Sequence, residues 1–508
     1  MAADAEKIVR ANAPAVQQPV IEMPSEKLAI REVDGALAFL RNEADASIAE
    51  LDEKRLVRRI DWLIMPMLFG VYVLQYIDKS LINYANVMGI SKDTHMSAAQ
   101  FSYLATFFYV TFAVFQPVHA YLMQKFPTAQ YLGVNVVLWG LTLAVHSACN
   151  NFGGLIVVRL LLGVFESASA PCLILITGMW YKRAEQPLRV AIWYLGVGAG
   201  TIIGALSSFG FQFYDGKAFK SWQIMFLIFG LITIAWGIIV FLFLPNSPMA
   251  SRFTHEEKVL AIERLRENMT GIENKTFKTP QFVETIMDLR TWLIAVIILA
   301  GNVPTGACGT FSSTLIKGFG YTSKQSALLN IPSGAISMVS VLGASWYAGR
   351  FNGRGYGICA LLIPGILGGG LMAFLPKTDK AGKLVGIYLT QTFGPNLSIM
   401  YSWAAANYAG HTKKISINAI ILFAYGASNI IGPLTFTGYT APQYVPAKVA
   451  IMACLSVGVV GALVLRFAYL WENRRRDKLA AEGAIPHIQD AEFMDLTDKQ
   501  NMEFRYAL

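Results

Sequence analysis

The sequence predicts an all-α membrane protein in which twelve transmembrane helices form two six-helix bundles. The first reason is composition: 54% of the 508 residues are hydrophobic, 15% are charged and the mean hydropathy is +0.45, whereas soluble domains carry about 25% charged residues. The second is that apolar runs of about 20 residues, long enough to cross a bilayer as a helix, recur along the chain. The third is a polar central stretch that separates six such runs from six more, which indicates a duplicated unit.

The first bundle is expected over residues 60–244. The preceding segment, 1–59, is polar and rich in Ala and Glu, and it has no signal-peptide pattern, so we interpret it as a cytoplasmic tail. The runs expected to span the membrane in the first bundle lie at about 60–83, 101–123, 129–149, 153–180, 189–213 and 222–244.

The polar stretch 245–290 is expected to be a cytoplasmic loop between the bundles. Within it Thr254 is followed by Glu257, which predicts a capping box at the start of a short amphipathic helix. The second bundle is expected over 291–471. Its spans are predicted at about 291–316, 325–347, 355–375, 383–407, 416–437 and 446–471.

The distribution of basic residues predicts the orientation. If the N-terminus is cytoplasmic, the inner connections hold clearly more Lys and Arg than the outer ones, and the last segment, 472–508, opens with Arg474, Arg475 and Arg476. The positive-inside rule then places both termini, including 472–508 as a second tail, in the cytoplasm. We expect a multi-pass protein of the plasma membrane that functions as a monomer.

Two opposite charges stand out in the fourth apolar run. Arg159 and Glu166 are seven residues apart, so on a helix they project from nearly one face, with Gly163 between them leaving room for a ligand or a neighbouring helix. A charge at the centre of a membrane helix costs about 2.5 to 3.5 kcal/mol on insertion scales. Intramembrane ionisable residues therefore indicate a transport path, and the alternative is a structural ion pair that locks two helices together.

A second pair of charges, Asp78 and Lys79, ends the first run. A proton-coupled carrier needs a buried carboxylate that takes up and releases a proton, and a nearby cation that exchanges this carboxylate for the incoming anion. Glu166 with Arg159 fits this requirement. The plain alternative for Asp78 and Lys79 is an ion pair at the outer membrane edge.

Other polar residues inside the runs are candidates for a cavity lining, although hydrogen bonds between helices explain such residues equally well. The Gly394-Pro395-Asn396 and Asn302-Val303-Pro304 strings are better candidates, because Gly and Pro interrupt helices where carriers bind ligands, or else form hinges. The remaining candidates are Tyr72, Gln75, Tyr109, Gln116, Gln391 and Asn407.

Several other functions find no support in the sequence. No nucleophile–base set, metal-ligand spacing or phosphate loop appears, so we expect neither an enzyme nor a cofactor or metal site. The five cysteines have no paired spacing, which favours free thiols. The net charge of +9 arises from basic residues beside apolar runs, which is typical of membrane topology and not of a nucleic-acid-binding face.

A series of short strings between about residue 50 and the C-terminus is specific in its joint order. The strings are Tyr76-Ile-Asp78-Lys79 with Asn83, Arg159-x3-Gly163-x2-Glu166-x4-Pro171, Trp180-Tyr181, Ala409-Gly410-His411-Thr412-Lys413-Lys414, Asn429-x2-Gly432-Pro433 and Asp495 to Tyr506. In these strings the chain resembles the anion:cation symporter family of the major facilitator superfamily, and within it the fungal allantoate permease group.

This resemblance implies roles at matching positions. Asp78 and Glu166 would carry protons, Arg159 would meet the anionic group of the substrate, Lys79 would pair with a carboxylate or help gate the site, and Asn429 would contact substrate from the second half. Asn396 and Tyr109 complete the expected substrate-binding set. The fifth run lacks the Gly-Pro pair of drug:proton antiporters, which favours uptake over efflux.

We therefore expect a proton-coupled symporter that imports a small organic anion by alternating access, with the proton gradient as its driving force. The implied substrates are allantoate, ureidosuccinate, small peptides or vitamin-like carboxylates, taken up by a fungus. Two alternatives stay open: an exporter of an acidic secondary metabolite, and a nutrient sensor with a transporter fold.

Overall fold

The computed structural model describes residues 52–508 except for residues 124, 183–184, 215, 217–218, 267–277, 352, 438–439, 442 and 483–495. Most of the expected tail 1–59, part of the loop 245–290 and part of the tail 472–508 therefore lie outside the described residues. The expected domain boundaries stay predictions.

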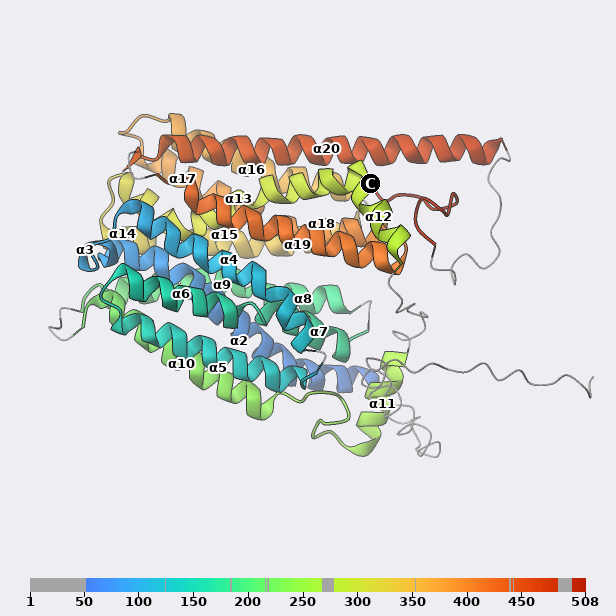
Figure 1. Cartoon of the computed structure of the whole chain (residues 1–508), viewed down its shortest axis with the longest axis horizontal. Coiled ribbons are helices and arrows are strands. Elements are labelled where there is room, and N and C mark those ends of the chain that lie inside the picture. Colours follow the sequence, from blue (N-terminus) through green and yellow to red (C-terminus); the bar gives the residue numbers. More distant parts are fainter. Residues whose placement is uncertain are drawn as a thin grey trace, which may run out of the picture. The chain divides into compact units, whose positions relative to one another are not determined.

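The first half of the described chain is helical (Figure 1). Its elements are α2 (Glu53–Met88), α3 (Ile90–Asp93), α4 (Ala98–Leu122), α5 (Thr128–Val145), η2 (His146–Ala148), α6 (Phe152–Glu166), α7 (Ser169–Trp180), α8 (Gln186–Tyr194), α9 (Gly196–Phe211) and α10 (Ser221–Phe243).

Two helices, α11 (His255–Arg266) and α12 (Thr279–Met287), follow in the central loop. The second half consists of α13 (Leu289–Gly318), α14 (Ser323–Leu328), α15 (Ile331–Arg350), α16 (Arg354–Phe374), α17 (Lys380–Thr390), η4 (Gln391–Phe393), α18 (Asn396–Asn407), α19 (His411–Leu434) and α20 (Val445–Ala481).

Eleven helical segments of the described chain are long and apolar enough to cross a membrane. The remaining expected span, 383–407, is the tenth in chain order. It is divided into α17, the 3-10 turn η4 and α18, and neither α-helix alone has the length of a span. Pro395 explains part of this division, because a proline lacks a backbone N–H and its ring prevents a continuous helix. The all-α membrane fold is confirmed, and its tenth span is a broken helix.

The predicted capping box is confirmed. The backbone N–H of Thr254 donates to Glu257 Oε2 at 3.1 Å, and the backbone N–H of Glu257 donates to Thr254 Oγ1 at 3.4 Å. These bonds satisfy donors that the first turn of α11 would otherwise leave free.

The room left at Gly163 is taken by a neighbouring helix. A Cβ atom at this position would lie 2.5 Å from the carbonyl oxygen of Phe108 in α4, so only glycine permits the observed approach of α6 to α4. A similar approach joins the two halves, where a Cβ at Gly198 in α9 would overlap the backbone oxygen of Gly334 in α15.

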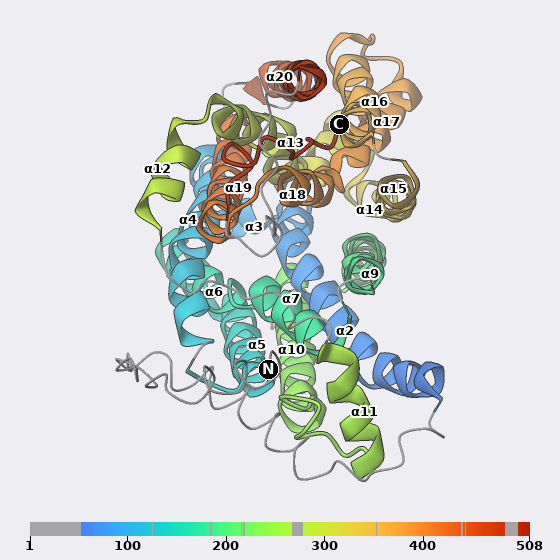
Figure 2. The ribbon, with the colours of Figure 1, turned by 90° about the vertical axis from the view of Figure 1, so that its right-hand side faces the viewer.

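We call the end of the described chain that holds the start of α2 and the segment 496–508 the proximal end, and the end that holds α3 and α14 the distal end (right and left in Figure 1). Figure 2 looks along the helices and shows α13 and α16–α20 gathered apart from α5, α7 and α10.

Hydrogen bonds between the halves lie mainly at the distal end in the described residues. Asn83 Nδ2 in α2 donates to the hydroxyls of Ser312 and Ser313 in α13 at 2.9 and 3.0 Å, and its Oδ1 accepts from the backbone N–H of Ser313 at 2.9 Å. Nearby, Asn86 Nδ2 donates to Thr314 Oγ1 at 2.9 Å. The two halves are thus joined at the distal ends of α2 and α13.

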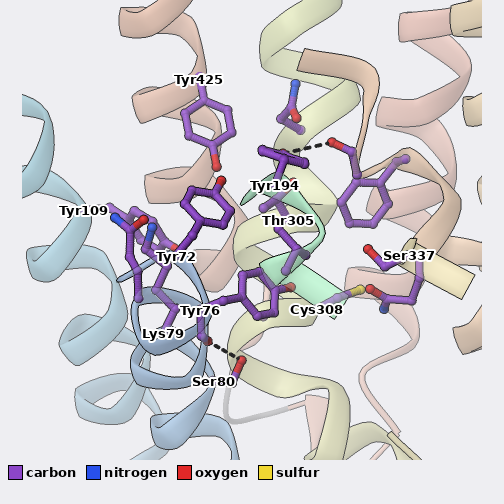
Figure 3. Close-up of a pocket in the computed structure, with 17 residues that line it drawn as sticks. Tyr72, Tyr76, Lys79, Ser80, Tyr109, Tyr194, Thr305, Cys308, Ser337 and Tyr425 are labelled. Atoms are coloured by element: carbon purple, nitrogen blue, oxygen red, sulfur yellow. Dashed lines mark hydrogen bonds between the residues drawn. The ribbon is translucent and has the colours of Figure 1, made fainter. Parts of the chain in front are cut away.

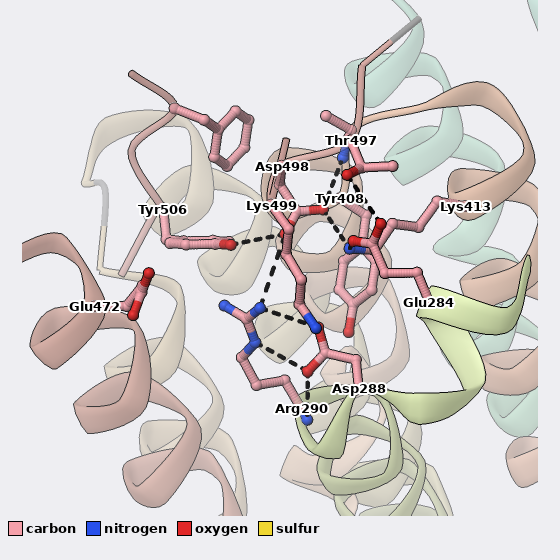
Figure 4. A network of polar contacts seen from close by, with 12 residues as sticks. Glu284, Asp288, Arg290, Tyr408, Lys413, Glu472, Thr497, Asp498, Lys499 and Tyr506 are labelled. Carbon is pink, nitrogen blue, oxygen red and sulfur yellow. Dashed lines mark hydrogen bonds and ion pairs between the residues drawn. The ribbon is translucent and has the colours of Figure 1, made fainter. Parts of the chain in front are cut away.

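The C-terminal segment 496–508 packs onto the proximal end of the second half (Figure 4). Its Asp498 lies 2.6 Å from the Nζ of Lys413, a fully buried side chain that also pairs with Glu284 at 2.6 Å. Arg476 of α20 is buried and donates to the backbone oxygens of Asp498, Asn501 and Phe504. The matched string at the chain end therefore connects α12, α19 and α20.

Candidate functional site

A cavity lies between the two halves, and residues from eight helical elements of the described chain line it (Figure 3). Its lining is unusually rich in tyrosine hydroxyls and carboxamides, with one charged group, Lys79. The lining residues are Tyr72, Gln75, Tyr76, Lys79, Ser80, Tyr109, Tyr194, Val197, Asn302, Thr305, Cys308, Gly309, Ser337, Gln391, Phe393, Gly394 and Tyr425.

Helix α2 contributes the largest share of the first-half lining. Tyr72, Gln75, Tyr76 and Lys79 follow one another at intervals of three, one and three residues, which places them on one face of the helix. This face looks into the cavity, while buried apolar residues of α2 such as Val71 and Leu74 pack inside the bundle. The sequence period of α2 therefore places Lys79, which alone is charged among the described lining residues, beside three polar aromatic or amide groups.

Lys79 joins this cavity to a buried carboxylate. Its Nζ lies 3.2 Å from Glu166 Oε1, and the side chain of Glu166 is fully buried whereas that of Lys79 is 21% exposed. Neither oxygen of Glu166 accepts a hydrogen bond from the described residues. Lys79 also lies over the ring of Phe112, 5.0 Å from its centroid. Lys79, which lines the cavity, is thus paired with Glu166, which does not.

Arg159 occupies a different place from the one expected for a substrate-binding group. It is 3% exposed, it does not line the cavity, and its guanidinium carbon lies 5.8 Å from the centroid of Phe226. Its Nε and Nη2 have no hydrogen-bond partner among the described residues. No ion pair joins Arg159 to Glu166 in the described chain. Glu166 pairs with Lys79 instead.

Asp78 is fully buried and points away from its neighbour in sequence. Its Oδ2 accepts a hydrogen bond of 2.6 Å from the indole N–H of Trp139 in α5, and its Oδ1 has no partner within the described chain. No ion pair between Asp78 and Lys79 is found in the described residues, so the plain interpretation of these two as an edge ion pair does not match the geometry. Asp78 instead joins α2 to α5 inside the first half.

The polar residues expected from the second half divide into two groups. Asn302 and Gln391 line the cavity, whereas Asn396 and Asn429 do not. Asn429 is fully buried and its Nδ2 donates to the backbone oxygen of Tyr425 at 2.9 Å, while its Oδ1 has no partner in the described part. Asn396 is also fully buried, with neither amide atom paired there, and it packs against Gly301. Of the five expected substrate-binding residues, Lys79 and Tyr109 line the cavity, whereas Arg159, Asn396 and Asn429 do not. Their roles stay predictions.

Three tyrosines of the lining were not expected from the sequence. Tyr76 has a local signal, because it lies on the same α2 face as Lys79, one turn earlier. Tyr194 and Tyr425 have none, because they come from α8 and α19 and meet α2 only in the folded chain. Tyr194 also donates to the backbone oxygen of Gly394 at 3.4 Å, which links the halves beside the cavity. The described residues contain no group of three His, Cys, Asp or Glu placed to hold a metal ion.

Comparison with known proteins agrees with this geometry. Residues 68–433 match the family model described as Major Facilitator Superfamily. A thiamine pathway transporter of Saccharomyces cerevisiae is 40% identical over 454 residues, which cover 89% of this chain and 86% of that protein. An allantoate permease of the same yeast is 33% identical over 493 residues, which cover 94% of this chain and 90% of the permease.

A solved structure shares the fold at low sequence identity. A bacterial homolog of the human lysosomal transporter Spinster, in an inward-facing and occupied conformation, aligns with a TM-score of 0.59 and 14% identity. The alignment covers 80% of this chain and 96% of the bacterial chain. The expected resemblance to the superfamily and to its fungal allantoate permease group is confirmed.

Proposed function

Because the chain belongs to the Major Facilitator Superfamily, whose members are transporters and not enzymes, we propose that it is a proton-coupled symporter that imports a small organic anion. The observation that carries the proposal is the 3.2 Å ion pair between Lys79, the charged group of the cavity lining, and the fully buried Glu166. Such a pair can exchange one partner for a ligand when the other changes its charge.

The exchange proceeds as follows. A proton that binds Glu166 neutralises the carboxylate and releases Lys79, whose ammonium group then pairs with the anionic group of a substrate in the cavity. When the substrate leaves, Lys79 carries an uncompensated charge, which favours loss of the proton from Glu166 and restores the ion pair. Proton and anion are then carried together because each stabilises the site for the other.

Asp78 and Arg159 have supporting roles in this proposal. Both residues are buried in the first half. Asp78 directly precedes Lys79, and Arg159 lies on the same helix as Glu166. Each has polar atoms without a partner in the described chain. We assign Asp78 to proton transfer and Arg159 to holding negative charge near the site, either that of the substrate or that of the two carboxylates. Tyr109 contacts the substrate from α4.

The distal hydrogen bonds between the halves fit a state that is closed at the distal end. With both termini in the cytoplasm, as the positive-inside rule indicates, this is a state closed to the outside. Alternating access then requires the bonds of Asn83 to Ser312 and Ser313 to break as the halves rock. We place the protein, as a monomer, in the plasma membrane of a fungus.

Two of the relatives are an allantoate permease and a thiamine pathway transporter, and they guide the choice of substrate class. For this chain we propose a small carboxylate or ureide anion, such as allantoate, ureidosuccinate, a small peptide or a vitamin-like carboxylate. Tyrosine hydroxyls and the carboxamides of Gln75, Asn302 and Gln391 supply donors and acceptors for the polar remainder of such a molecule.

Uptake of labelled carboxylates and ureides in cells lacking their own permeases tests the proposal. We expect uptake of at least one of these anions to rise when the external pH falls and to collapse when a protonophore removes the gradient. Uptake that ignores the gradient would contradict symport. Accumulation of an acidic metabolite in cells that lack the protein would indicate an exporter, and ligand binding that triggers signalling without uptake would indicate a sensor.

A further inference from the structure

Two buried lysines approach one aromatic ring at the distal end of the second half. Lys383 lies in α17 and Lys448 in α20, and the two residues are 8% and 4% exposed. Their Nζ atoms lie 5.8 and 4.8 Å from the centroid of Phe319, which follows the last residue of α13. Three helices that are distant in sequence thus bring two positive charges to the same ring.

Neither lysine has an acidic partner in the described residues. No ion pair or hydrogen bond is formed by either ammonium group there, whereas the other buried lysine, Lys413, lies between the two carboxylates of Glu284 and Asp498. The nearest acid in sequence, Asp379, accepts a hydrogen bond of 2.8 Å from the backbone N–H of Gly382 and pairs with neither lysine. A buried charge without a partner is costly, so this arrangement favours a bound anion.

The backbone adds to the positive potential. Lys383 is the fourth residue of α17 and Lys448 the fourth residue of α20, so both side chains start from the first turn of a helix. The N-terminal end of a helix carries partial positive charge and disfavours lysine unless an anion is near. The first turn of α20 has no side-chain cap. Contact with Phe319 offsets part of the repulsion by cation–π attraction but supplies no negative charge.

We propose that Lys383, Lys448 and the N-terminus of α20 form a site for a phosphate group, separate from the central cavity. Two ammonium groups offer six donors and two charges, which matches a phosphate better than a single carboxylate. Neither lysine lines the central cavity, so the site does not depend on the proposed transport reaction. The phosphate comes either from a free ion or ester in solution or from the headgroup of an anionic lipid.

The test uses the purified full chain and compares the unmodified protein with the double variant Lys383→Gln and Lys448→Gln. Lys380→Gln is the matched control, because Lys380 starts the same helix but is exposed and donates to the backbone oxygen of Gly320 at 3.1 Å. Thermal unfolding is followed in detergent with inorganic phosphate against chloride at equal ionic strength. It is followed again in phosphatidylcholine vesicles with and without phosphatidylglycerol.

A ligand that binds only the folded state raises the unfolding temperature as its concentration rises. A rise with inorganic phosphate that the control keeps and the double variant loses supports a soluble phosphate. A rise with phosphatidylglycerol alone, again lost in the double variant, supports a lipid headgroup. An equal response of the unmodified protein and the double variant to both probes overturns the site.

A variant that preserves both charges distinguishes loss of phosphate binding from loss of folding. Lys383→Arg with Lys448→Arg keeps both positive charges and is expected to keep the stabilisation by the same probe. If the arginine variant elutes as a monodisperse protein in size-exclusion chromatography and yet loses the response as fully as the glutamine variant, the proposal is wrong, because charge would then not be the determinant.

Discussion

Lys79 Nζ of α2 lies 3.2 Å from Glu166 Oε1 at the end of α6, and of these two residues the lysine alone reaches the central cavity. The ligand-accessible charge and the buried titratable group are thus two different residues in direct contact. A substrate anion that pairs with Lys79 must compete with Glu166, and this competition makes the two binding events interdependent.

Replacing Glu166 with Gln should abolish concentrative uptake while sparing exchange of substrate across the membrane. Glutamine keeps the shape of a protonated glutamate but cannot release a proton, so Lys79 stays available to substrate in both orientations. The measurement is uptake against a gradient, compared with counterflow of labelled substrate in vesicles. Glu256→Gln, which changes an exposed residue of α11, is the control. Normal concentrative uptake by Glu166→Gln would exclude this residue from proton coupling.

Replacing Lys79 with Gln should raise the KM for substrate by about tenfold or more. A hydrogen bond to a charged group contributes about 1.5 to 3 kcal/mol, and 1.4 kcal/mol corresponds to a factor of ten. Lys79→Arg keeps the charge and should retain more of the affinity. Initial uptake rates over a range of substrate concentrations give the KM of each variant. An unchanged KM in Lys79→Gln would show that substrate binds elsewhere.

Arg159→Ala should lose substrate binding, either because Arg159 itself meets the substrate anion or because its charge acts on Asp78 and Glu166. Removing one partner of a buried charge cluster costs about 2 to 5 kcal/mol. Binding is measured directly on purified protein, and uptake in cells. Arg159→Lys separates the two explanations, because a lysine restores the charge but not the planar donors of arginine. Unaltered binding and uptake in Arg159→Ala would assign this residue a purely structural role.

Lys413→Ala should destabilise the protein without changing the substrate KM. Lys413 is fully buried between Glu284 and Asp498, and breaking a buried ion pair from one side costs about 3 to 5 kcal/mol. Thermal unfolding of purified protein measures the effect, with Lys414→Ala as the control because its neighbour Lys414 is exposed. Deleting 496–508 should have a similar effect, since the segment carries Asp498. Equal unfolding temperatures for the two lysine variants would argue against this network as a stabilising element.

We expect the folded protein to lose stability in acid because of the carboxylate of Asp288. Burial disfavours its carboxylate, but hydrogen bonds and charges from Arg290 and Lys499 outweigh this and lower the pKa of Asp288 to about 2. An unfolded aspartate has a pKa of about 3.9. The folded state therefore binds the proton less well, so the contribution to stability is complete above about pH 4 and is lost as the pH falls from about 4 towards 2.

The unfolding temperature should accordingly fall more steeply below about pH 4 in the unmodified protein than in Asp288→Asn, which has no carboxylate to protonate. Asp477→Asn, at an exposed position of α20, should leave the steep acid limb in place. Parallel curves for the unmodified protein and Asp288→Asn would rule out this contribution.

The fold class could be predicted from the sequence because hydropathy is measured along the chain and does not depend on which residues meet in the fold. A bilayer requires about 20 consecutive apolar residues per helix, so the spans and the division into halves are visible without any contact. The strings around Asp78, Arg159 and Glu166 likewise indicated the family. The interruption of the tenth span was visible as Gly394-Pro395, although its extent, two short helices joined by a 3-10 turn, was not.

Which charges meet was decided only by tertiary structure. The spacing of Arg159 and Glu166 on one helix suggested that they act together, but Glu166 pairs with Lys79 of another helix, and Asp78 turns to Trp139 and not to its neighbour Lys79. Spacing along one helix fixes only the direction in which a side chain leaves it. The partner it meets depends on how helices far apart in sequence pack, and this packing also brought Tyr194 and Tyr425 to the cavity.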